Sequence, residues 1–232
     1  LTTAAPAQSG ATLHMSLDDR SYPLFFGDQS GNGNAATCSG DACPTMSNDG
    51  KYAAAFDFDG VDDTVTVADN ATLRNPAYTL SAWFQWDDID TDNIQFLTAK
   101  GFENLEIQTG GGAGVNGIAV IPAGYPETNV DVPNFIQPGW NHVAVTYDGD
   151  KVAVYRNGVL VGERSDITGG NDLTADTSPL RLGVRSDGTY RFDGALDDVR
   201  LFSRALTSPC GKIRIPINED RGETGQIVNY LK

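Results

Sequence analysis

The sequence is poor in basic residues and has no long hydrophobic run. Of its 232 residues, 16 are lysine or arginine and 31 are aspartate or glutamate, which gives a formal net charge of −15. This charge repels nucleic acid and anionic membrane surfaces, so we expect neither as a partner. No stretch approaches the roughly 20 apolar residues that a membrane-spanning helix needs, so direct membrane insertion is not expected either.

The N-terminal stretch lacks the pattern of a signal peptide. Residues 1–11 are mostly small, include Pro6 and resemble a linker. We therefore interpret the sequence as a segment of a longer protein that is secreted or displayed on the cell surface.

Cysteine and histidine are scarce. Cys38 and Cys43 in "CSGDAC" are close enough to close a small disulfide loop, and the Asp-, Gly- and Thr-rich, Lys-poor composition favours that pairing. The alternative is three reduced thiols, and Cys210 is left over in either case. The two histidines, His14 and His142, match no zinc-ligand spacing, so zinc is not expected.

Helical periodicity is also missing, and β-strand patterns take its place. Alternating or β-branched runs occupy residues 63–67, 78–86, 94–100, 105–109, 117–121, 140–149, 151–156, 159–164, 179–184 and 190–203. Turn signals separate the runs, among them Asn157-Gly158, which is typical of a two-residue hairpin. At most a helical turn is expected, near residues 70–76 or after Arg204. Hairpin-linked strands without crossover helices predict an all-β antiparallel sandwich.

The last predicted strand contains an unusual carboxylate. In "FDGALDDVRLFSRAL" (192–206), strict alternation places Asp197 on the same face as the apolar residues Ala195, Val199 and Leu201. Burial of an ionised carboxylate without a partner costs several kcal/mol or more, so such groups are normally paired, protonated or bound to a metal. Asp197 is therefore expected to have a cationic partner.

Six phrases, in this order, resemble the laminin G-like branch of the concanavalin A-like lectin/glucanase superfamily. They are "DQSGNGN" (28–34), "AAFDFDGVDDTVTV" (54–67), "YTLSAWFQW" (78–86), "GWNHVAVTYDG" (139–149), "VAVYRNGVLVG" (152–162) and "FDGALDDVRLFSRAL" (192–206). The resemblance covers residues 12–207 and implies a jelly roll of two curved antiparallel sheets whose first and last strands lie together. Residues 208–232 are then a C-terminal extension of uncertain structure, in which "KIRIPI" could add an edge strand.

The resemblance also implies a calcium ion where the first and last strands meet. Carried onto this sequence, Asp197 supplies a carboxylate and Gly60 of "FDG" a carbonyl, while Asp28 is the natural second carboxylate and Asn34 offers a further oxygen. Calcium takes six to eight oxygen ligands at about 2.3–2.6 Å.

The residues of "DQSGNG" favour the same ion independently of the resemblance. Asp28, Ser30 and Asn32 alternate before Gly33, as in calcium loops of the EF-hand type. The alternative is that Asp28 only begins a turn, while Asp197 pairs with an arginine such as Arg200 or Arg204.

A second group of residues consists of candidates for contact with a ligand at the rim. Three aspartates alternate in the acidic loop "DDIDTDN" (87–93), which offers a second calcium site or is simply a solvated loop. Two tyrosines lie in later loops, whereas Trp83 and Trp140 match family positions that are normally buried. The rim candidates are Trp86, Asp88, Asp90, Asp92, Tyr125 and Tyr190.

Catalytic carboxylates are not apparent. Glucanases of this fold carry E-x-D-x-E on one strand face, but the nearest candidates here, Glu103 and Glu106, are three apart and so face opposite ways. Neither histidine lies in a nucleophile motif.

We therefore expect a non-catalytic, calcium-stabilised recognition module that binds carbohydrate or a surface glycoconjugate on the concave face or at the loop rim. The first alternative is a structural or adhesive domain that contacts protein or peptide. The second, less favoured, is a glycoside hydrolase or polysaccharide lyase of the same fold.

Overall fold

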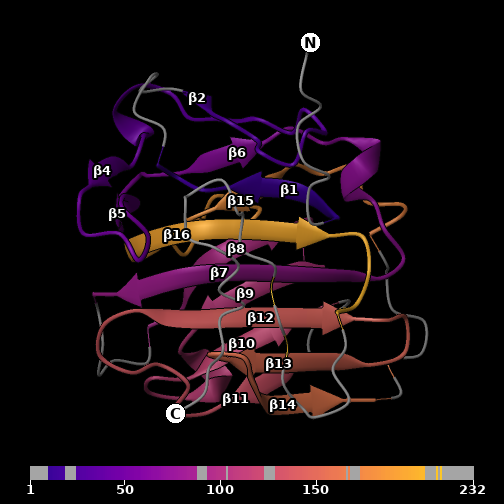
Figure 1. The fold of residues 1–232 in the computed structure, drawn as a ribbon. Coiled ribbons are helices and arrows are strands. Elements are labelled where there is room, and N and C mark those ends of the chain that lie inside the picture. Colours follow the sequence, from indigo (N-terminus) through magenta and orange to yellow (C-terminus); the bar gives the residue numbers. More distant parts are fainter. Residues whose placement is uncertain are drawn as a thin grey trace.

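Two antiparallel β-sheets pack face to face in the structure (Figure 1). It is a computed structural model, and it describes residues 10–18, 25–87, 93–102, 104–122, 129–165, 167, 173–206, 213 and 215. The fold is the predicted all-β antiparallel sandwich. Among the described residues, no helix is long and apolar enough to cross a membrane.

The first sheet, sheet A, faces the viewer in Figure 1. Its strands are β1 (Ala11–Met15), β4 (Thr45–Ser47), β5 (Ala55–Asp59), β7 (Tyr78–Trp86), β12 (Asn141–Tyr147), β13 (Val152–Arg156), β14 (Val159–Arg164) and β16 (Asp193–Phe202). They run in the order β14–β13–β12–β7–β16–β5–β4, and β1 also pairs with β16.

The second sheet, sheet B, lies behind sheet A in Figure 1. Its strands are β2 (Phe25–Phe26), β3 (Ala36–Thr37), β6 (Val65–Val67), β8 (Gln95–Lys100), β9 (Leu105–Thr109), β10 (Ile118–Ile121), β11 (Val130–Val132) and β15 (Leu180–Leu182). Their order is β11–β10–β9–β8–β15–β6–β3–β2. Short 3₁₀ turns complete the described elements: η1 (Gly40–Ala42), η2 (Ala71–Leu73) and η3 (Gly111–Ala113).

Each of the predicted β-runs contains a strand, and η2 lies where a helical turn was expected. The strands that the alternation did not predict are short or N-terminal: β1, β2, β3, β4, β5 and β11. The first and last strands pair antiparallel, with His14 opposite Arg200, as the resemblance implied.

The core lies between the sheets and follows the two-residue period of the strands. In sheet B, Leu105 and Ile107 of β9 point into it, and so do Ile118 and Val120 of β10. The residues between them, such as Glu106, therefore lie on the outer face of sheet B. This alternation fixes which side chains can meet a ligand there.

A bulge in β16 corrects the face assignment made from sequence. Asp198 has a φ of 51°, and the pairing with β7 shifts register between Asp197 and Arg200. The extra residue reverses the alternation, so Leu196 and Val199 both face the core although they are three apart. The expectation that Asp197 shares a face with Val199 was therefore wrong. Asp197 lies on the outer face of sheet A, opposite Trp83.

Part of the outer face of sheet A is covered by the chain itself. Ile213 is buried against a small apolar cluster that includes Tyr155 and Phe202, and its amide donates to the carbonyl of Gly158 at 3.0 Å. Ile213 lies beyond residue 207, where the laminin G-like domain was expected to end. Packing on the sandwich thus continues into the C-terminal extension.

The predicted disulfide joins Cys38 to Cys43, with their Cα atoms 5.1 Å apart. It closes a five-residue separation around η1, next to sheet B.

A groove on sheet B and the predicted calcium residues

A groove of about 240 Å³ crosses the outer face of sheet B. Its lining comes from strands β8 to β11 and from the loop that follows β15. Cross-strand pairing places Asp131, Ala119, Gln108 and Phe96 in one row, because each is directly opposite the next. Three interstrand spacings of about 4.8 Å give this row a length of roughly 14 Å.

The second row on this face contains a buried carboxylate. Ile121, Glu106, Ala99 and Arg181 are opposite one another on β10, β9, β8 and β15. The Glu106 side chain has no exposed surface. A carboxylate at such a position needs a cation.

Arg185 is that cation. Its Nε lies 3.5 Å from Oε1 of Glu106, and its Nη1 lies 3.6 Å from Oδ2 of Asp187. The guanidinium also packs against three aromatic rings, with its Cζ 4.3 Å, 5.5 Å and 5.9 Å from the ring centroids of Phe102, Phe96 and Tyr190. These contacts fix the planar guanidinium at one end of the groove.

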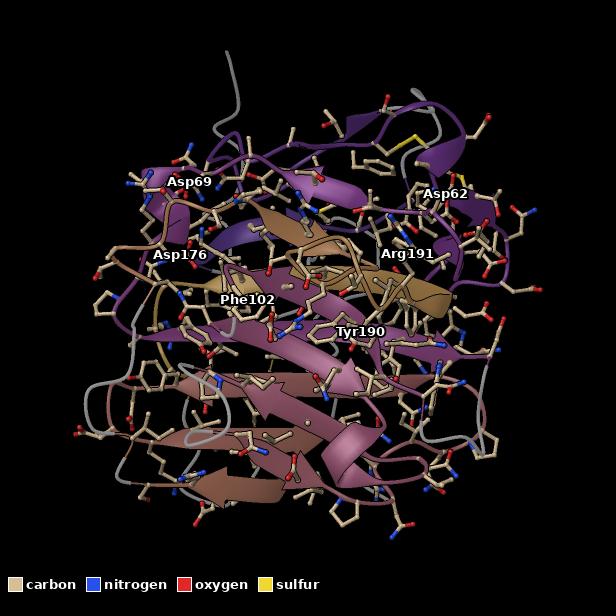
Figure 2. The ribbon with its side chains drawn as sticks, turned by 180° about the vertical axis from the view of Figure 1, so that it is seen from behind. Asp62, Asp69, Phe102, Asp176, Tyr190 and Arg191 are labelled. Atoms are coloured by element: carbon tan, nitrogen blue, oxygen red, sulfur yellow. A yellow bond between two sulfur atoms is a disulfide. The ribbon has the colours of Figure 1, made fainter. Side chains whose placement is uncertain are left out.

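Aromatic and polar groups therefore share this site. Tyr190 is 46% exposed and packs on Phe96, with ring centroids 5.9 Å apart. Its backbone lies in the left-handed region, with a φ of 54°. At the other end, the Asn129 side-chain amide donates to both oxygens of Asp131, at 3.0 and 3.1 Å. Figure 2 shows the molecule from behind, with Phe102 and Tyr190 together on this face.

The structure separates the predicted rim residues. Tyr190 lines the groove, as a ligand-contacting residue must. Trp86 is only 4% exposed, packs in the core and donates its indole N–H to Oε1 of Gln95 at 2.8 Å, so its ring has no face to offer a sugar. Its neighbour Asp87 ends the described segment. The remaining candidates lie outside the described residues: Asp88, Asp90, Asp92 and Tyr125.

Asp28 and Asn34 are brought together in one loop, in which Asn34 Oδ1 is buried without a hydrogen-bond partner among the described residues. The Asp28 carboxylate accepts from the amides of His14, Ser30 and Asn34 at 2.8–3.0 Å, and from the Ser30 hydroxyl at 2.7 Å. Four hydrogen bonds use the four lone-pair positions of a carboxylate. Asp28 thus orders the "DQSGNGN" loop against β1 and fits poorly as a calcium ligand.

The other two predicted ligands lie elsewhere. Gly60 follows β5 with a φ of 70°, and a Cβ there would come within 2.9 Å of Asp193 Cβ, which explains the glycine. Asp193 and Asp197 are four residues apart on β16, about 13 Å along a strand. Asp28 lies on the opposite edge of β1 from β16, because both the amide and the carbonyl of His14 bond to residues 28 and 29. The four residues therefore do not converge.

Asp197 instead binds a backbone segment that a second carboxylate, Asp18, also binds. It has no exposed surface, and its Oδ2 accepts from the amide of Tyr52 at 2.7 Å. Two residues further on, the amide of Ala54 donates to Oδ1 of Asp18 at 3.1 Å. The carboxylates of Asp197 and Asp18 thus both accept hydrogen bonds from the backbone of residues 52–54. Sequence reasoning missed Asp18, whose signal is its place three residues after the first strand.

Asp198, which directly follows Asp197 in the sequence, forms a buried ion-pair cluster. Its Oδ1 lies 3.0 Å from Nε2 of His14 and accepts from Arg200 at 2.8 and 3.0 Å. Burial opposes ionisation, but the His14 hydrogen bond and the charge of Arg200 outweigh it and hold the pKa of Asp198 below its ordinary value. The sequence alternative had paired Arg200 with Asp197.

A third acidic group lies in the turn around Gly60. The carboxylates of Asp59, Asp62 and Asp63 approach within 4.8 Å of one another. Backbone amides of Val61 and Asp62 donate to Asp59, and the amide of Asp59 donates to Asp63. These bonds account for the cluster as an ordered turn.

Residues 59–209 match the laminin G-like profile of the concanavalin A-like lectin/glucanases superfamily. The chain belongs to this family.

Solved structures agree with the sandwich. Domain 4 of AbnA, a GH43 extracellular arabinanase from Geobacillus stearothermophilus in complex with arabinotriose, is similar with a TM-score of 0.63. The two are 24% identical, and the similarity covers 85% of this chain and 94% of that one. At this identity the likeness shows the fold alone.

Two curated proteins match smaller parts. Adhesion G-protein coupled receptor V1 of Danio rerio is 28% identical over 138 residues, which is 56% of this chain and 2% of the receptor. The 4-hydroxyphenylpyruvate dioxygenase of Pseudomonas aeruginosa is 62% identical over 32 residues, 9% of that enzyme. The chain thus spans only a small fraction of the curated relatives it matches.

Proposed function

We propose that this chain is a non-catalytic recognition module that binds carbohydrate in the groove of sheet B. The single observation that carries this proposal is the groove's composition. A half-exposed Tyr190 ring shares the groove with the polar side chains of Gln108, Asp131 and Arg185. Binding sites for small polar ligands combine apolar or aromatic surface with a few fixed polar groups in this way.

Each part has a distinct role toward a sugar. The C–H face of a sugar ring is apolar and packs on an aromatic ring, which here is Tyr190 supported by Phe96. Hydroxyl groups donate to the Asp131 carboxylate and accept from the Gln108 amide and the Arg185 guanidinium. Since β8 to β11 are rigid strands, these groups are held in place before the ligand arrives.

The pairing of Glu106 supports binding over hydrolysis. Glycosidases need two carboxyl groups facing the scissile bond, about 5–5.5 Å apart for retention of configuration. Glu106 is fully buried, does not line the groove and forms an ion pair with Arg185. Its role is therefore to fix Arg185.

The comparisons are consistent with this role. The arabinanase domain of the same fold was solved with a bound trisaccharide, and the curated match of greatest extent is an adhesion receptor. We accordingly place this module in a secreted or cell-surface protein.

A binding titration tests the proposal. Wild-type protein is titrated by calorimetry with arabinotriose and a panel of neutral trisaccharides, and Tyr190→Ala is expected to weaken binding of the best ligand at least about tenfold. Val61→Ala is the matched control, because Val61 is also an exposed apolar residue, 72% exposed, but lies outside the groove. Absence of binding across the panel, or equal binding by Tyr190→Ala, would contradict the proposal.

Recognition of protein or peptide is the second candidate. Phe102 is 59% exposed next to the groove and, with Tyr190, extends an aromatic surface beyond it. Exposed aromatic rings of this kind anchor protein partners. A peptide partner that Phe102→Ala abolishes, with no saccharide bound by the wild type, would favour this function.

We also propose calcium as a structural ion, centred on Asp197 and Asp18 rather than on Asp28. Two carboxylates held by amides two residues apart concentrate negative charge, which favours a hard cation. Calcium bound only by the folded state would add about 2.7 kcal/mol at a hundredfold excess over Kd.

Thermal melts with calcium and with chelator test this ion. Calcium should raise the melting temperature of the wild type but not of Asp197→Asn. Asp28→Asn should lower the melting temperature by the same amount with calcium and with chelator, because Asp28 orders a loop through hydrogen bonds. Superimposable wild-type melts would rule out the ion.

A further inference from the structure

We infer that the groove selects uncharged saccharides and rejects acidic ones, through Glu106 and Asp131. The inference rests on the proposed function and specifies the class of sugar. A sugar carboxylate needs a guanidinium or ammonium group that is still available to it.

The Arg185 guanidinium is the only cationic group among the described residues that line the groove, and it is already neutralised. Oε1 of Glu106 lies 3.5 Å from its Nε, and Oδ2 of Asp187 lies 3.6 Å from its Nη1. The Arg185 side chain is 17% exposed and Glu106 is fully buried, so solvent screens this pair weakly. Two carboxylates thus share one positive charge.

Asp131 adds negative charge at the other end. Its carboxylate is exposed at the groove and is contacted by a neutral amide, that of Asn129. A uronate bound along the Asp131–Phe96 row would bring its own carboxylate toward this group. Like charges placed together at an interface cost several kcal/mol, whereas a neutral hydroxyl donates to the same oxygens.

The rest of the face does not reverse this balance. Arg181 lies on the same face, two strands from Glu106 and outside the groove lining. Arg191 donates to the carbonyls of Asp62 and Asp63. The net charge of −15 adds a long-range repulsion of anions.

Paired calorimetric titrations test the selectivity. The neutral probes are arabinotriose, xylotriose and cellotriose, and the acidic probes are triglucuronate and trigalacturonate. We expect both acids to bind at least about tenfold more weakly than the best neutral probe. This preference for the neutral probe should become smaller as ionic strength rises, since the screening length falls to about 3 Å at 1 M salt.

The variants locate the cause. Glu106→Gln leaves Arg185 with less compensation and should raise the ratio of acidic to neutral binding about tenfold. Asp131→Asn should raise the same ratio from an exposed position, which keeps the test decisive where Glu106→Gln does not fold.

The outcomes separate the two claims. Acidic probes that bind as tightly as the best neutral one, or ratios unchanged in the folded variants, would overturn the selectivity while leaving carbohydrate binding intact. Failure of every probe to bind would instead remove the proposed function, and the selectivity with it.

Discussion

The ring of His142 lies on the outer face of sheet A against the indole of Trp83, with ring centroids 5.1 Å apart. Burial lowers the pKa of His142 to about 4, although the negative charge of Asp198 acts in the opposite direction. Arg200 and Lys51 add to the lowering. The ring is therefore neutral in the folded protein across the mildly acidic range.

This burial predicts a loss of stability in acid. The unfolded chain binds a proton at His142 below its ordinary pKa of 6.5, and the folded chain does so only near pH 4. The free energy of unfolding should thus fall by up to about 3 kcal/mol between these values, measured by urea denaturation. Asp57 and Asp63, whose pKa values burial raises, act with the opposite sign.

The matched variant isolates the histidine. His142→Gln should flatten the decline between pH 6.5 and 4, because its side chain does not titrate. A decline of the same slope in His142→Gln would assign the acid sensitivity to other groups.

The positions of some single residues could not be predicted from the sequence. Strict alternation assigned Asp197 to the core, but Asp198 adopts a left-handed conformation, and the bulge there reverses the faces. Aspartate adopts this conformation more readily than most residues, yet nothing local in "LDDVR" dictates it. Arg185 and Glu106 were missed as a pair because they are distant in sequence, and only the β9–β8–β15 pairing brings them together.

At the scale of elements, a buried lysine joins β8 to two loops. The Lys100 ammonium donates to Oδ1 of Asp69 at 3.2 Å, to the carbonyl of Asp176 at 3.2 Å and to that of Ser178 at 2.5 Å. Its side chain has no exposed surface. Figure 2 shows Asp69 and Asp176 close together at the same side of the sandwich.

Replacement of Lys100 should therefore destabilise the fold strongly. Lys100→Met removes a buried cation and leaves the carbonyls of Asp176 and Ser178 without this donor, while Asp69 keeps its ion pair with Arg74. Since each unsatisfied buried acceptor costs about 1–3 kcal/mol, we expect a loss of about 3–5 kcal/mol in chemical denaturation. The control is Lys151→Met, which breaks the exposed Lys151–Glu163 pair and should cost less than about 1 kcal/mol. Equal losses in the two variants would contradict the role assigned to Lys100.

The strands that the sequence predicted are those with one or both faces buried. Long runs such as β7 and β12 combine β-branched and aromatic residues, so their type is evident without tertiary information. The two-residue strands β2 and β3 have too few residues for a pattern. They form because β6 offers a partner edge to β3, and β3 in turn pairs with β2. The disulfide was predictable because the spacing of Cys38 and Cys43 is local.

For the whole molecule, the two outer faces of the sandwich differ in what they leave open. Sheet A is covered in part by Ile213 of the C-terminal extension. Sheet B keeps an open groove over β8 to β11. The alternation of "LEIQT" already places Glu106 and Gln108 on one face, but only the neighbouring strands show that this face is the groove.

The most direct measurement is an NMR titration of the isotope-labelled chain with arabinotriose. Amide shifts should change most at Gln108, Asp131 and Tyr190, and these changes should disappear in Tyr190→Ala. Shifts confined to the outer face of sheet A, or none at saturating sugar, would contradict carbohydrate recognition in the groove.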